Sequence, residues 1–99
     1  MSPLAVILAD PTRVGLAVEL VMATAALGGE ALLYLHAAAV PGAREPLIGE
    51  ALAAGVRVIV CQTGLAEAGL AFADLSEGVE AGGLVSLLAE AGAYRLVVV

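Results

Sequence analysis

Three side chains in this sequence could do chemistry: Asp10, His36 and Cys61, the last being the only cysteine. Each of them ends or follows a short apolar run, and these runs cover residues 4–9, 31–36 and 56–60. Continuous apolar runs of this length are typical of strands buried on both faces of a parallel sheet. Ligands of such sheets bind outside the carboxyl ends of the strands, so we expect these side chains at neighbouring strand ends.

Cys61 is the strongest candidate, because it lies between a buried strand and the start of a helix expected at about Gly64. A helix N-terminus favours an anion, and such positions commonly lower the pKa of a cysteine from about 8.5. The thiolate would be a nucleophile or a carrier of sulfur. The alternative is that Cys61 is a small hydrophobic residue completing a core strand, as most free cysteines are.

His36 and Asp10 have simpler structural interpretations. His36 could hold a proton or orient a partner, but it could equally be a strand-end histidine bonded to backbone. Asp10 precedes Pro11 and is more simply the cap of the following helix. No metal-ligand spacing and no glycine-rich nucleotide motif is present, so we expect neither a metal nor a cofactor. The pair Gly82-Gly83 indicates close packing or a tight turn.

The remaining pattern alternates strands with helices, which predicts parallel pairing through helical crossovers. Helices are expected over about residues 11–27, from 46 to the glycine at 55, over 64–73 with Thr63 as cap, and over 81–91. Loops are expected over 37–43 and 74–80, and a last strand over 94–99. These four strand signals predict an α/β fold in a single domain, residues 1–99, with the strand order 2-1-3-4.

Composition excludes several classes of protein. The 99 residues are 62% apolar and carry a net charge of −6 with only four basic residues, which disfavours binding to nucleic acid. The longest stretch without Asp, Glu or Arg, residues 31–43, is too short to span a membrane, which takes about 20 residues. The N-terminus lacks the basic stretch of a secretory signal, and one cysteine suits a reducing cytoplasm.

The first helix predicts self-association. Between Val14 and Leu27 its only charged residue is Glu19, and a helix that is apolar nearly all round is normally buried on more than one side. A chain of this size cannot easily bury it alone, so we expect a homo-oligomer, with a small tolerated exposed helix as the alternative. The acidic residues are expected to form a solvated face; they include Glu45, Glu50, Glu67, Glu77, Glu80 and Glu90.

Four stretches, taken in order, resemble the small DsrE/DsrF-like (DsrEFH-like) proteins over nearly the whole chain. The most telling is a strand that closes on Cys-Gln, Val58-Ile59-Val60-Cys61-Gln62. The others are Asp10-Pro11 before a helix rich in Ala and Leu that ends at Leu27-Gly28, Gly78-Val79-Glu80 with Gly82-Gly83 before the last helix, and the closing Val97-Val98-Val99.

This resemblance implies a three-layer α/β/α sandwich around a parallel sheet of four to five strands, assembled as a trimer or hexamer. It further implies sulfur relay, in which Cys61 takes sulfane sulfur from a donor protein as a persulfide and passes it to an acceptor. The protein would be a sulfurtransferase-like carrier, with backbone N–H groups of Gln62, Thr63 and Gly64 stabilising the charged sulfur. His36 and Asp10 complete the expected binding site.

Two other functions are alternatives to sulfur relay, and the second is the weaker. The protein could be a non-catalytic oligomeric binding module in which Cys61 only packs, and a Cys61 unreactive in the native state would favour this reading. A thiol peroxidase is disfavoured, because no second cysteine could resolve a sulfenic acid.

Overall fold

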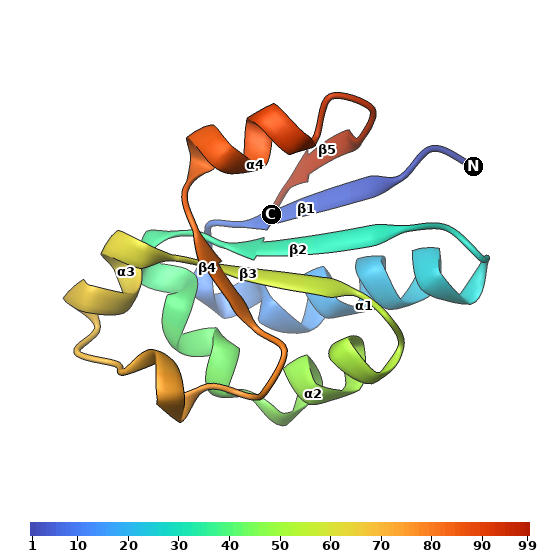
Figure 1. Cartoon of the computed structure of the whole chain (residues 1–99). Coiled ribbons are helices and arrows are strands. Elements are labelled where there is room, and N and C mark those ends of the chain that lie inside the picture. The colour runs from blue at the N-terminus through green and yellow to red at the C-terminus, as the bar shows by residue number, and fades with distance from the viewer.

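The computed structural model describes residues 1–99 as one parallel sheet with helices on both faces (Figure 1). The five strands are β1 (Leu4–Leu8), β2 (Ala31–Leu35), β3 (Arg57–Cys61), β4 (Glu80–Gly82) and β5 (Arg95–Val98). The α-helices are α1 (Val14–Ala26), α2 (Pro46–Ala53), α3 (Gln62–Glu67) and α4 (Leu84–Glu90). Three 3₁₀ helices, η1 (Pro11–Arg13), η2 (Ala37–Arg44) and η3 (Phe72–Asp74), complete the chain. The predicted α/β sandwich around a parallel sheet is confirmed.

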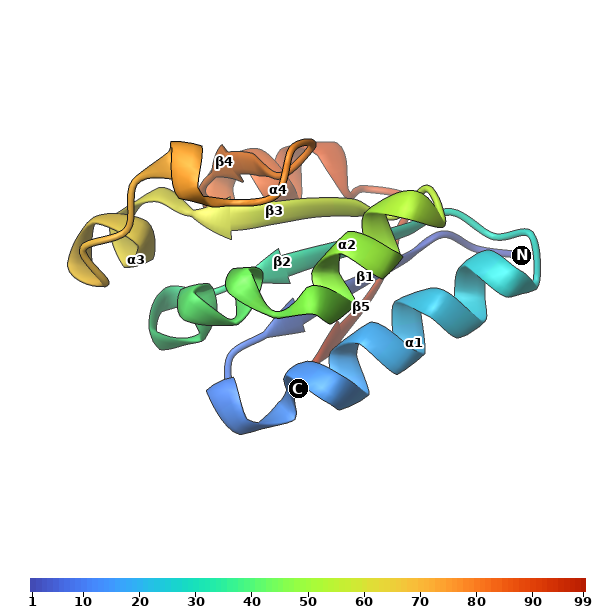
Figure 2. The same ribbon diagram turned by 90° about the horizontal axis from the view of Figure 1, so that it is seen from below.

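The strand order is β4-β3-β2-β1-β5, with every pair parallel. The predicted order 2-1-3-4 is therefore wrong, since β2 lies between β1 and β3. The chain steps in one direction from β1 to β4 and reverses only between β4 and β5. Right-handed crossovers in opposite directions place their helices on opposite faces, so α1 and α2 cover one face and α4 covers the other (Figures 1 and 2).

The two faces of the sheet bury unequal cores. The core beneath α1 and α2 contains 19 buried residues, whereas the core beneath α4 contains five. These five are Ala5, Leu32, Tyr34, Ile59 and Leu87. Every residue of β2 is buried, which agrees with its place at the centre of the sheet and with its continuous apolar sequence.

Helix α1 buries one face only. Its buried residues are Ala17, Val18 and Val21, while Leu16 remains 42% exposed. The expectation that this helix is covered on more than one side is therefore not met within one chain. The most exposed large apolar side chain of a helix is instead Val85 of α4, at 86%.

Three local predictions need correction. Strand β4 was not expected, because its three residues, Glu-Ala-Gly, show no apolar run and it forms by pairing with β3. The helix expected over residues 64–73 is divided into α3 and η3, since Gly69 takes a left-handed φ of 68° just after α3. Residues 37–43, expected as a loop, form η2 with Ala39, Val40 and Ala43 buried.

The six acids expected on a solvated face are all exposed, and two of them also form ion pairs. Glu80 of β4 forms a two-pronged ion pair with Arg57 of β3 at 2.9 and 3.0 Å, and Glu90 of α4 pairs with the same guanidinium at 3.0 Å. One arginine thus joins the edge strand and α4 to the sheet. No helix of the chain combines the length and apolar character needed to cross a membrane.

Candidate functional site

The carboxyl ends of β1, β2 and β3 are adjacent, as expected, although the strand order differs from the predicted one. The ladder between β2 and β3 pairs Tyr34 with Ile59 and Leu35 with Val60. Continuing this register by one residue places His36 beside Cys61. Side chains alternate between the faces of a strand, so Tyr34, His36 and Cys61 share the face covered by α4.

Cys61 is partly exposed and directly precedes α3. Its Sγ accepts a hydrogen bond from the backbone N–H of Gly64 at 3.4 Å. Cys61 is therefore the N-cap of α3, so the prediction that Thr63 caps this helix is wrong. Because α3 has only six residues, individual N–H groups rather than a long helix dipole act on the sulfur.

The surroundings of Cys61 lower the pKa of its thiol. Burial is the largest single influence and acts in the opposite direction, because it disfavours the anion. Backbone N–H groups of Gly64, Ala37 and Thr63, together with the Tyr34 hydroxyl, outweigh it by stabilising the thiolate. The site therefore increases the fraction of nucleophilic thiolate near neutral pH.

Gly64 is required by the close approach of α3 to η2. A Cβ built on Gly64 would lie 2.7 Å from the carbonyl oxygen of Ala37 and 2.7 Å from Cγ2 of Val40. Both distances are shorter than Cβ contacts in real proteins. Because the Ala37 oxygen belongs to the backbone, it cannot move aside as a flexible side chain could. The absence of a side chain at Gly64 thus lets the N–H donors of Gly64 and Ala37 converge on one sulfur.

Ala37 is the only non-glycine residue with a positive φ, at 48°. A left-handed conformation costs an L-residue about 1–2 kcal/mol, so the surrounding packing must hold it. Ala37 directly follows His36 and turns the chain from β2 into η2, where its N–H acts on Cys61. The strained residue therefore lies within the site.

Tyr34 belongs to this site but was not predicted as part of it. Its side chain is fully buried, and its hydroxyl has no hydrogen-bond partner. Burial, with a smaller contribution from the neighbouring Cys61, raises the pKa of Tyr34 to about 12. The hydroxyl and the sulfur interact electrostatically without the geometry of a formed hydrogen bond. The sequence did contain a sign that Tyr34 belongs to the site. It is a tyrosine in the otherwise aliphatic run ALLYL, two residues before His36, and a buried tyrosine usually finds a polar partner.

His36 packs against Tyr34, with ring centroids 6.1 Å apart and an angle of 29° between the ring planes. Its Nδ1 is buried and has no hydrogen-bond partner. His36 was alternatively expected to be hydrogen-bonded to the backbone. Its main-chain N–H does donate to the carbonyl of Leu8 at 2.9 Å, but its Nδ1 forms no such bond. Two unpartnered polar groups, on Tyr34 and His36, thus lie on the face of Cys61.

The remaining predicted residues differ in their roles. The Asp10 carboxylate accepts hydrogen bonds from the N–H and hydroxyl of Thr12 at 2.9 and 2.7 Å, so its predicted capping role is confirmed. These bonds lower the pKa of Asp10. Gln62 and Thr63 are exposed, and of the two only Thr63 contributes, through its backbone, to the pKa of Cys61. No three His, Cys, Asp or Glu side chains group closely enough to hold a metal ion.

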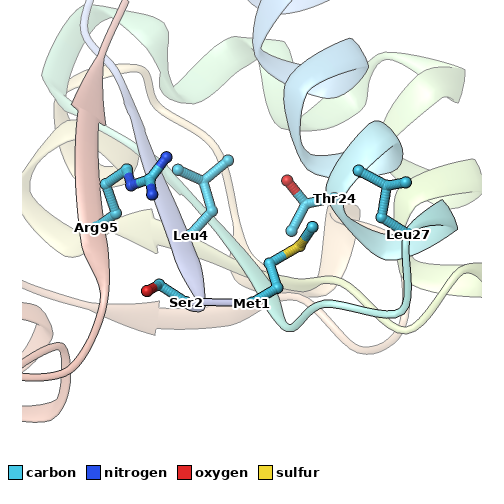
Figure 3. A pocket seen from close by; sticks show the side chains of 6 residues that line it. All are labelled: Met1, Ser2, Leu4, Thr24, Leu27 and Arg95. Atoms are coloured by element: carbon cyan, nitrogen blue, oxygen red, sulfur yellow. The ribbon is translucent and has the colours of Figure 1, made fainter.

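No cavity is lined by Cys61, although ligands were expected to bind at the carboxyl ends of these strands. A pocket of about 380 Å³ lies instead at the amino ends of β1 and β5, where Met1, Thr24 and Arg95 contribute to its wall (Figure 3). This is the opposite end of the strands from Cys61. Cys61 itself is partly exposed at the other end.

Comparisons with known proteins define the class of fold. Similar solved structures are a protein of unknown function, MTH1491, from Methanobacterium thermoautotrophicum (TM-score 0.83, 19% identity) and the ychN protein from E. coli (0.74, 21%), each matched over 100% of both chains. BT1422 of Bacteroides thetaiotaomicron, also of unknown function, matches 99% of this chain and 95% of its own (0.76, 16%). No family model and no curated protein matches the sequence. The similarity establishes the fold.

Proposed function

We propose that this protein is a DsrE-like sulfur carrier in which Cys61 holds sulfane sulfur as a persulfide. The observation that supports this most is a partly exposed thiol whose Sγ accepts the Gly64 N–H and whose pKa is lowered by converging donors. Backbone amides that stabilise a thiolate also stabilise a persulfide anion, which carries its charge on the adjacent sulfur. A reducing, cytoplasmic location fits a protein with one free thiol.

The transfer needs no external oxidant. The Cys61 thiolate attacks the outer sulfur of a donor persulfide, R–S–SH; the donor S–S bond breaks, Cys61–S–SH forms, and R–S⁻ leaves. A thiolate of an acceptor then attacks the outer sulfur on Cys61, which releases the Cys61 thiolate and yields the acceptor persulfide. Charge and sulfur oxidation level are conserved in both steps.

The partial exposure of Cys61, outside any cavity, favours proteins as donor and acceptor. A small-molecule site encloses most of its ligand, whereas Cys61 lines no cavity. A cysteine carried on a partner's surface could approach the sulfur directly.

Loading with inorganic polysulfide tests the proposal. We expect the native protein to gain the mass of one sulfur atom in intact-protein mass spectrometry, with the gain lost in Cys61→Ser and reversed by a thiol reductant. A wild-type protein that gains nothing under conditions that load a known persulfide carrier would contradict the proposal.

A second candidate is the non-catalytic binding module. It is favoured by the packing of Cys61 against both hydrophobic cores. In that case Cys61 would be alkylated only after unfolding, whereas a sulfur carrier requires alkylation of the native protein.

We further propose that the protein forms a homo-oligomer, trimeric or hexameric, through α4 and β5. Large apolar side chains are exposed on both elements: Leu84, Val85 and Leu88 on α4, and Leu96 and Val98 on β5. Strand β5 is also an unpaired edge of the sheet. A second copy of the chain would cover this surface, which is more exposed than that of α1.

A further inference from the structure

The Tyr34 hydroxyl is a buried polar group that the free protein leaves without a partner. The tyrosine is 0% exposed and lies in the small core beneath α4, between aliphatic residues. A buried hydroxyl without a hydrogen bond destabilises the folded state, and a phenylalanine would fill the same space without this cost. In the free protein only an electrostatic interaction with Cys61 offsets this cost.

Register and packing direct this hydroxyl toward Cys61. Tyr34 is paired with Ile59, two residues before Cys61, and the side chains of all three share one face of the sheet. Diagonal neighbours on adjacent strands lie within reach of an aromatic side chain. His36 stacks on the Tyr34 ring and restricts its position at the end of β2.

We propose that the Tyr34 hydroxyl donates a hydrogen bond to the outer sulfur of a Cys61 persulfide and thereby holds that sulfur in place. This inference rests on the proposed sulfur-carrier function and assigns a residue to it. The outer sulfur lies about 2 Å beyond Sγ, which extends the reach of the cysteine toward a hydroxyl that Sγ alone does not bond. Hydrogen bonding moves no proton and changes no oxidation state.

The protonation state of Tyr34 suits this role. The pKa of about 12 keeps its hydroxyl protonated, and hence a donor, throughout the neutral range. The persulfide anion is an acceptor in the same range. A neutral donor facing an anionic acceptor forms one of the stronger kinds of hydrogen bond.

The test compares Tyr34→Phe with Tyr94→Phe, after both variants and the wild type are loaded with inorganic polysulfide. Tyr94 is the only other tyrosine and lies at the opposite end of the strands, just before β5, so its variant is a matched control. Loss of the bound sulfur is followed by mass spectrometry and by cyanolysis. We expect Tyr34→Phe to lose its sulfur about tenfold faster than the other two, the effect of one charge-assisted hydrogen bond.

Two further measurements separate this role from a structural one. The unloaded Tyr34→Phe protein should unfold at the same temperature as the wild type or higher, because the buried hydroxyl forms no hydrogen bond that the substitution would remove. In Tyr94→Phe, Tyr34 is the only tyrosine and no tryptophan is present, so its fluorescence reports on one phenol. That fluorescence should change on loading, and should not change in Tyr94→Phe/Cys61→Ser.

Each contrary result has a distinct meaning. If the wild type takes up no sulfur, the sulfur-carrier function fails and this inference with it. If the wild type loads but Tyr34→Phe retains sulfur equally long with unchanged fluorescence in the Tyr94→Phe protein, only the role of Tyr34 is overturned. Marked thermal destabilisation of unloaded Tyr34→Phe would overturn it as well, by showing a structural bond.

Discussion

At the scale of single residues, the Cys61 environment is set by backbone geometry. Gly64 and the left-handed Ala37 bring main-chain donors toward one sulfur, and no basic side chain is among the groups that lower its pKa. Backbone donors are already oriented by the fold, so they need little reorganisation when the thiolate forms.

The first prediction concerns the pH dependence of Cys61 alkylation. Since the folded protein lowers the pKa of this thiol, its reaction with iodoacetamide should rise at lower pH than in urea-unfolded protein. The linked stability contribution should be present above the unfolded pKa and lost as pH falls through the folded one. Stopped-flow alkylation between pH 5 and about 10 would measure it. A native midpoint at or above the unfolded one would contradict the prediction.

The second prediction concerns Gly64. A methyl group at this position would clash with the Ala37 carbonyl and with Val40, so Gly64→Ala should lower the free energy of unfolding by about 1–3 kcal/mol. It should also slow Cys61 alkylation by displacing two donors. Urea denaturation of the two proteins would measure the first effect.

Gly49 provides the matched control. It lies inside α2, and a Cβ there would meet nothing within 4 Å. Gly49→Ala should therefore raise the free energy of unfolding by about 0.5–1 kcal/mol, through lower chain entropy in the unfolded state. If Gly64→Ala and Gly49→Ala changed the free energy of unfolding equally, η2 would have to move away from residue 64 without cost, which would contradict the prediction.

At the scale of elements, β4 and α4 are held mainly by what they contact elsewhere. Strand β4 has three residues and α4 buries Leu87 as its one large core side chain. Arg57 ties both to β3 through Glu80 and Glu90. Such short elements have too little local pattern to be stable alone.

The third prediction concerns the pH dependence of the stability that the Arg57–Glu80 ion pair contributes. Arg57 holds the pKa of Glu80 below its usual value, so the stabilisation is present above the ordinary glutamate pKa and lost as pH falls through the lowered one. Because the pair is nearly half exposed, we expect Glu80→Gln to cost only about 0.2–1 kcal/mol at pH 7. The cost should disappear in strong acid and shrink in high salt.

Glu77→Gln is the control for this pair, since Glu77 is exposed and forms no ion pair in the structure. Its effect on urea denaturation should be negligible at both pH values. An equal loss in the two variants would reveal an effect of overall charge rather than of the Arg57 contact.

At the scale of the whole molecule, five of the ten large apolar side chains that are exposed lie on α4 and β5. Val85 and Val98 are 86% and 66% exposed, on two elements that succeed one another along the chain. The apolar sequence of the first helix predicted the contact there, but this helix buries one face against the sheet. The two surfaces give different predictions for assembly.

The fourth prediction compares Val85→Glu with Leu16→Glu by light scattering coupled to size-exclusion chromatography. We expect the wild type to be a homo-oligomer and Val85→Glu to dissociate, because a buried carboxylate at an apolar contact is strongly disfavoured. Leu16→Glu on α1 should leave the assembly intact. Dissociation by Leu16→Glu alone would assign the contact to α1, and a monomeric wild type would exclude both.

The sequence by itself determined the class of fold and the positions of the candidate side chains along it. The apolar runs at residues 4–9, 31–36 and 56–60 predict buried parallel strands. A strand with apolar side chains on both faces is stable only when both faces are covered. The positions of Asp10, His36 and Cys61 after those runs place them at one edge of the sheet.

Only the tertiary structure decided the strand order, the existence of β4 and the membership of the site. Strand order depends on crossover directions, and β4 exists because β3 offers it a partner; neither leaves a local pattern. Tyr34 looked like a core residue until the register placed it diagonally from Cys61. Periodicity reports whether a side chain is covered, whereas contacts between distant segments decide which group faces which, and those contacts are absent from any short stretch of sequence.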